Sequence, residues 1–138
     1  MPAEDLVVFR YQDEGVATLE DGLYALGPRL ENSAFRARLA GFLRASMMGW
    51  RYALRHRQEA VAIVLKAGRG TLDRRTQARM LRGIAALVAG GKRGIGYLEP
   101  ADYRRTVAVL LSGKGGRVIH REPQGAWTHA IWNSAQER

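Results

Sequence analysis

The chain has 138 residues, of which 46% are hydrophobic and 25% are charged, and this is the composition of one globular domain. It contains no cysteine, which excludes disulfides, thiolate metal sites and a cysteine nucleophile. The formal net charge is +9, but seven of the 13 acidic residues lie in the first 35 positions and 20 of the 22 basic residues follow them. Because the basic residues are spread along predicted helices, we interpret them as solvated helix faces.

Three segments of the chain predict short β-strands. Residues 6–11 are mainly apolar, β-branched or aromatic, and a polar turn follows them. Residues 22–26 predict a second strand, which ends at Gly27 and Pro28 because proline cannot donate to a ladder. Residues 118–120 predict a third. Two short strands do not make a self-sufficient sheet, so we expect the helices to cover a sheet that other residues complete.

Five helices are predicted from apolar side chains spaced three and four residues apart. The longest follows Asn32 or Ser33, either of which can cap the free N–H groups of the first turn. Trp50 lies on the apolar side of this helix, and we interpret it as a core residue. The second helix is apolar almost all round, so we expect neighbours to cover it. The predicted helices cover residues 32–54, 57–67, 73–89, 100–111 and 126–135.

Short motifs occur in a fixed order along almost the whole chain. They include the Asp-Gly-Leu-Tyr sequence at 21–24 and the Gly-Trp pair at 49–50. The motifs occupy residues 11–16, 19–24, 42–50, 59–65, 98–107 and 125–130. Together they resemble the C-terminal part of a family of solute-binding proteins of ABC importers, which captures thiamine-pyrimidine precursors, sulfonates and similar small molecules.

The resemblance implies an α/β fold, namely the mostly helical C-terminal portion of a type II periplasmic-binding-protein fold with two to four short strands and about five helices. It implies that residues 1–138 form a single domain, in which residues 6–20 cross between two lobes at a hinge and residues 21–135 return to the first lobe. The parent family is periplasmic. The acidic start of this chain, with Glu4 and Asp5, is unlike a signal peptide, and we expect none in it.

The resemblance also implies a ligand site beside the hinge. It places Tyr11, Asp13, Glu14 and Gly15 at the mouth of the cleft and Tyr24 on the segment that leaves it. A carboxylate in a closed, partly dry site is a suitable acceptor for a ligand rich in amino or ring N–H donors. Asp13 and Glu14 have an alternative explanation as ordinary turn residues.

The sequence offers no catalytic or metal-binding pattern. Its three histidines are far apart and lack the spacing of metal ligands, and its glycine clusters lack the remaining residues of a phosphate loop. No apolar stretch approaches the ~18 residues that a membrane span requires. We therefore expect no catalytic residue, no metal, no cofactor and no membrane insertion.

The expected function is that of a substrate-binding component, present here as a fragment, of an ABC importer. It would capture a pyrimidine or other N-heterocycle by hinge closure and present it to a permease. The apolar faces would be covered by a second copy or by a missing N-terminal lobe. The alternatives are a sulfonate- or organic-anion-binding protein of the same fold and a basic nucleic-acid-binding module around residues 69–93, although we expect no nucleic-acid partner.

Overall fold

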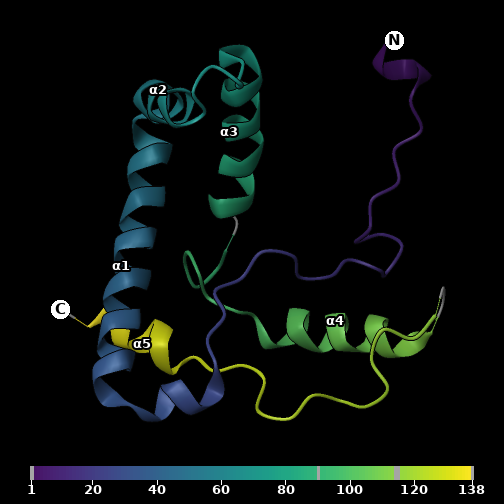
Figure 1. Cartoon of the computed structure of the whole chain (residues 1–138). Helices are drawn as coiled ribbons and strands as arrows, with labels where there is room; N and C mark the ends of the chain where they lie inside the picture. The colour runs from purple at the N-terminus through teal and green to yellow at the C-terminus, as the bar shows by residue number, and fades with distance from the viewer. Residues whose placement is uncertain (1, 90, 114–115, 138) are drawn as a thin grey trace. The chain divides into compact units, whose positions relative to one another are not determined.

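The computed structural model describes residues 2–89, 91–113 and 116–137, and all regular secondary structure in these ranges is helical. Two short 3-10 helices precede five α-helices (Figure 1). The elements are η1 (Ala3–Asp5), η2 (Gly27–Glu31), α1 (Ser33–Arg55), α2 (Arg57–Ala67), α3 (Arg74–Ala89), α4 (Pro100–Ser112) and α5 (Ala130–Gln136).

The predicted α/β fold class is wrong, because the described residues contain no strand and no sheet. Residues 6–10 and 22–26 run as open chain, and no neighbouring segment pairs with them (Figure 1). Residues 118–120 bend back onto the end of α4, where the N–H groups of Val118 and Ile119 donate to the carbonyl of Leu110. A strand forms only where a partner accepts and donates its backbone hydrogen bonds, and the described chain supplies none.

The chain folds as two compact units, each made of two separate segments. Unit 1 consists of Met1–Ala25 and Leu98–Thr128, and unit 2 consists of Leu26–Tyr97 and His129–Arg138. The predicted crossing segment, residues 6–20, lies within unit 1. Its role as a hinge between lobes stays a prediction, as does the return of residues 21–135 to a first lobe.

Unit 2 has a core between α1 and α5. The predicted cap is confirmed, since Asn32 Oδ1 accepts a 2.9 Å hydrogen bond from the N–H of Phe35 at the start of α1. The buried residues are Ala40, Met47, Ile131 and Ala135, and the partly buried ones packed against them are Leu30, Leu39, Leu43, Ile95 and Trp132. The core therefore joins the N-terminal half of α1 to the short C-terminal helix.

Helix α5 begins at Ala130, four residues later than predicted. Trp127, which the predicted helix over residues 126–135 includes, precedes α5 and lies beside Tyr103 in unit 1, with 5.8 Å between ring centroids. Arg44 of α1 holds the other end of α5. Its Nε donates to the carbonyl of Ala135 over 3.0 Å, and its Nη2 donates to those of Ser134 and Glu137.

Helices α1, α2 and α3 follow one another around a groove in unit 2. Figure 1 shows α2 across the C-terminal end of α1 and α3 turning back in the opposite direction. The α3 helix begins after Asp73, whose Oδ2 accepts a 2.7 Å hydrogen bond from the N–H of Thr76. The prediction that α2 is covered all round is wrong: Val61 is buried, but Ile63 and Val64 are exposed because only one side of α2 has neighbours.

Unit 1 is held mainly by polar contacts between the N-terminal chain and α4. Arg105 Nε donates to the carbonyl of Ala17, and the N–H of Leu19 donates to Thr106 Oγ1, both over 2.9 Å. Among the described residues of this unit, Val107 alone is buried and apolar. Unit 1 therefore has a much smaller core than unit 2.

Candidate functional site

A tight turn places the predicted acidic residues at its tip. The N–H of Asp13 donates to the carbonyl of Arg10 over 2.9 Å, and the N–H of Val16 donates to that of Tyr11 over 3.0 Å. Gly15 has a φ of 68°, a left-handed conformation in which a side chain would be strained. The glycine therefore allows the chain to reverse directly after Glu14.

This turn and α4 border an open hollow of about 430 Å³, which we name the turn hollow. It is lined by Glu14, Gly15, Val16, Arg105, Ala108, Val109 and Ser112. The volume lies within the range of sites that hold small molecules, roughly 300–1,000 Å³. All of these residues belong to unit 1, so the hollow is a property of that unit alone.

The polar groups of the turn hollow are held in place by hydrogen bonds within unit 1. Arg105 Nη1 forms a 2.8 Å ion pair with Asp102, and its Nε is bonded to the carbonyl of Ala17. These two bonds fix the guanidinium plane. Ser112 Oγ donates to the carbonyl of Val109 over 2.8 Å. The hollow thus combines the carboxylate of Glu14 with a positioned guanidinium and a hydroxyl.

The structure brings together two of the five predicted site residues. Glu14 and Gly15 line the turn hollow, whereas Tyr11 and Asp13 lie in the same turn but outside its lining. Tyr24 is 81% exposed, and its ring lies against Gly22 instead. Arg105 and Ser112 were missed by sequence reasoning. The sequence could have indicated them, because residues 105, 108, 109 and 112 have the spacing of one helix face.

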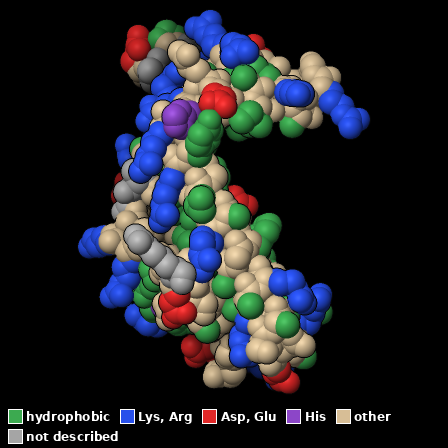
Figure 2. Space-filling model, turned by 90° about the vertical axis from the view of Figure 1, so that its left-hand side faces the viewer, with side chains coloured by type: hydrophobic (Ala, Val, Ile, Leu, Met, Phe, Trp, Pro, Cys, Tyr) green, Lys and Arg blue, Asp and Glu red, His purple; other side chains and the backbone are tan. Residues whose placement is uncertain are grey.

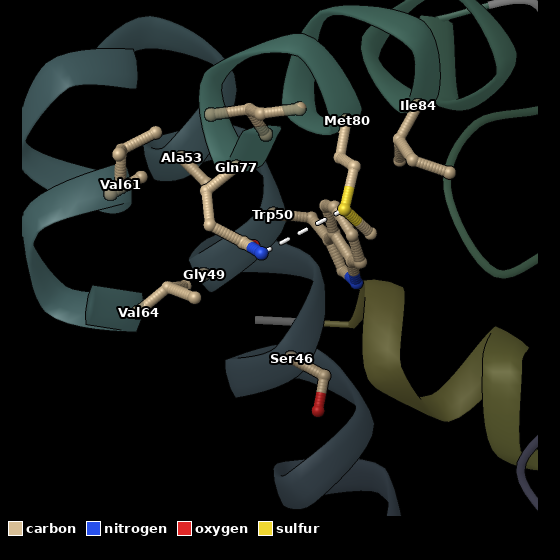
Figure 3. A pocket seen from close by; sticks show the side chains of 11 residues that line it. Ser46, Gly49, Trp50, Ala53, Val61, Val64, Gln77, Met80 and Ile84 are labelled. Atoms are coloured by element: carbon tan, nitrogen blue, oxygen red, sulfur yellow. Dashed lines mark hydrogen bonds between the residues drawn. The ribbon is translucent and has the colours of Figure 1, made fainter. Parts of the chain in front are cut away.

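A second hollow of about 480 Å³ lies in unit 2, and we name it the apolar groove. Its lining residues are Ser46, Gly49, Trp50, Ala53, Ala60, Val61, Val64, Gln77, Met80, Leu81 and Ile84. Figure 3 shows Gln77 and Met80 of α3 directed towards Trp50 of α1. The interpretation of Trp50 as a core residue is wrong, since its side chain is 42% exposed and forms a wall of the groove.

The histidines have contacts of other kinds than metal ligation. The ring of His56 stacks on that of Tyr52, and the ring of His129 stacks on that of Tyr97, each with 4.3 Å between centroids. Among the described residues, no three His, Asp or Glu side chains gather as a metal site would require. None of the helices in the described ranges combines a bilayer-spanning length with sufficient hydrophobicity.

Comparison with known proteins identifies no relative: no family model matches the sequence, and neither a curated protein nor a solved structure matches it. The resemblance noted in the sequence therefore stays a prediction.

Proposed function

We propose that this chain is a non-catalytic binding component that captures a small amino-substituted N-heterocycle, with pyrimidines as the leading class, in the turn hollow. The observation that carries the proposal is the presence of the Glu14 carboxylate and the positioned Arg105 guanidinium in the lining of one hollow of small-molecule size. An aminopyrimidine carries amino N–H donors beside ring-nitrogen acceptors. Glu14 accepts from the donors, while the remaining N–H groups of Arg105 donate to the acceptors.

The importer context of this proposal comes from the sequence resemblance. In that context the ligand is captured by hinge closure in the periplasm, and the closed form is recognised by an ABC permease. The chain would act with the remainder of a larger binding protein or with a second copy.

Two other classes of ligand are less well matched to the described residues. A sulfonate or another small organic anion would be attracted by Arg105 but repelled by Glu14 in the same hollow. A nucleic-acid function would use the basic surface, because Lys and Arg outnumber Asp and Glu on the face shown in Figure 2. However, the basic helix α3 offers no aromatic side chain on which a base could stack.

Isothermal titration calorimetry with 4-aminopyrimidine tests the proposal, with 2-aminoethanesulfonate and single-stranded DNA as rival ligands. We expect Glu14→Gln to weaken aminopyrimidine binding by about tenfold or more, because a hydrogen bond to a charged group is worth about 1.5–3 kcal/mol. Glu20→Gln, an exposed acid of the same unit outside the hollow, should leave the affinity unchanged. Undetectable aminopyrimidine binding, or equal binding by both variants, would refute the assignment.

A further inference from the structure

The apolar groove has features that a peptide backbone would satisfy. Eight of its lining residues are apolar side chains, and the polar side chains among them are Ser46 and Gln77. Among the described residues, the one hydrogen-bond partner of the Gln77 side-chain amide is a sulfur, with 3.8 Å between its Nε2 and Met80 Sδ. An amide of this kind offers one acceptor and one donor side by side, the complement of the N–H and C=O of an extended residue. The groove therefore suits an apolar occupant with a peptide backbone.

The groove also lies in the most basic part of the chain. Residues 33–89 contain 12 Lys or Arg and only Glu59 and Asp73 as acids. The α3 helix has four arginines and no acidic residue. In the described residues a single Lys or Arg side chain forms an ion pair, and it is Arg105 of unit 1. The positive charge around the groove is therefore not neutralised within unit 2, and an occupant with acidic residues beside its apolar part is favoured.

The N-terminal segment of this same chain has that character. Leu6, Val7, Val8 and Phe9 are between 49% and 80% exposed, and in the described structure their backbone groups form no hydrogen bond. We name these four residues the arm. Glu4 and Asp5 directly precede it, and Asp13 and Glu14 follow it at a short distance beyond Arg10. The arm is thus a largely exposed apolar peptide that acidic residues precede, and its backbone forms no hydrogen bond in the described structure.

The arm and the groove also agree in length. The groove extends from Ser46 to Ala53 on α1 and from Gln77 to Ile84 on α3. Seven residues of helical rise correspond to about 10 Å in each case. The four arm residues span about 10 Å between their first and last Cα atoms when extended. Figure 1 shows the arm as open chain, which can enter a groove without the loss of any regular structure.

We infer that two copies of this chain associate by exchange, with the arm of each copy seated in the apolar groove of the other. A single arm of four residues is small for a stable interface, but a twofold arrangement buries two arms and two grooves. In this arrangement the Gln77 amide pairs with the arm backbone, and Trp50 and Met80 cover the arm side chains. The inference does not depend on the proposed function, because neither the arm nor the apolar groove contains a residue that lines the turn hollow.

Sedimentation velocity of single variants and of their mixture tests the exchange. Met80→Asp disables the groove and Val8→Asp disables the arm, and each variant alone should dimerise at least about tenfold more weakly than the wild type. Their equimolar mixture should regain a dimer, because one intact arm still meets one intact groove. A dimer held by contacts between the two arms, or between the two grooves, would not be regained in the mixture. A mixture that stays monomeric would therefore overturn the inference.

Two controls separate the interface from folding. Leu87→Asp places the same charge on an exposed α3 residue outside the groove and should leave dimerisation unchanged. Circular dichroism should show equal helix content in all variants, because Met80 and Val8 are exposed in the single chain. A peptide of residues 2–12 should bind the Val8→Asp protein and not the Met80→Asp protein. A wild type that is monomeric at all concentrations, or a peptide that binds both proteins equally, would also overturn the inference.

Discussion

Removal of the Arg44 side chain beyond Cβ should release α5 from α1. In Arg44→Ala the three carbonyls at Ser134, Ala135 and Glu137 lose their shared donor. Hydrogen bonds to a charged group contribute about 1.5–3 kcal/mol when buried, but this guanidinium is largely exposed and solvent competes for it. With the favourable charge at a helix C-terminus included, we expect a loss of about 2 kcal/mol in the free energy of unfolding.

In Arg44→Ala we expect α5 to unfold locally, in addition to the loss of overall stability. This helix has seven residues and is too short to be helical without docking on α1. Urea denaturation followed by circular dichroism measures the loss of stability. Trp132, whose Nε1 donates to the carbonyl of Ile95 over 3.0 Å, reports docking by its fluorescence once Trp50 and Trp127 are replaced by Phe.

Two variants separate the contribution of the guanidinium geometry from that of its charge. Arg44→Lys keeps the charge but not the fork, so its stability should fall between those of the wild type and Arg44→Ala. Arg38→Ala, which removes an exposed arginine from the same helix, should stay within about 0.5 kcal/mol of the wild type. The reasoning is refuted if Arg44→Ala matches Arg38→Ala in stability and Trp132 emission is unchanged.

Two further predictions concern the core and the start of α3. Met47 is 2% exposed between α1 and α5, so Met47→Ala should lower the free energy of unfolding, measured by urea denaturation, by about 2–4 kcal/mol. The same change at the exposed neighbour Met48 should cost under about 0.5 kcal/mol. Equal losses in the two variants would contradict the assigned core. The Thr76 backbone N–H lowers the pKa of the Asp73 carboxyl, so the stability from this cap is present above the ordinary pKa of aspartate and is lost as the pH falls through the lowered value. Asp73→Asn keeps an acceptor that does not titrate, and its urea midpoint should therefore fall less than that of the wild type on acidification; parallel losses would show that the cap does not contribute.

The helices could be predicted from the sequence because their boundaries depend on local residues. Asn32 caps α1 with its own side chain. Pro100 begins α4, and its missing N–H is harmless there because the first N–H groups of a helix have no partner within the helix. Gly113 ends α4 in the left-handed conformation, with a φ of 71°. The start of α5 was predicted wrongly because Trp127 pairs with Tyr103, a contact between residues 24 positions apart.

The strands could not be judged from the sequence, because their formation depends on a partner that periodicity does not reveal. Residues 6–11 have the composition of a strand in any context, but a ladder forms only where another strand lies alongside. The same limit applies to the candidate site. Glu14 and Gly15 were predicted from the resemblance of the local motif at residues 11–16, whereas Arg105 joins them from a position about 90 residues later in the chain. The exposure of Trp50 likewise depends on where α2 and α3 pack, and not on its spacing in α1.

The two units differ in how many apolar residues they bury, and this difference affects how each unit responds to binding. Among the residues that the structure describes, six of the seven buried apolar ones belong to unit 2, and Val107 is the one in unit 1. The hydrophobic effect is the dominant favourable contribution to folding, so unit 1 has little stability of its own to offset the entropy of ordering its two segments. That same unit contains the turn hollow and the exposed arm. A ligand in the hollow or a partner on the arm would therefore stabilise unit 1 far more than it would stabilise unit 2, since any molecule that binds only the folded form shifts its equilibrium. Amide hydrogen exchange should accordingly be fast along residues 16–25 and slow in the core half of α1 in the free chain, and aminopyrimidine should slow the former selectively.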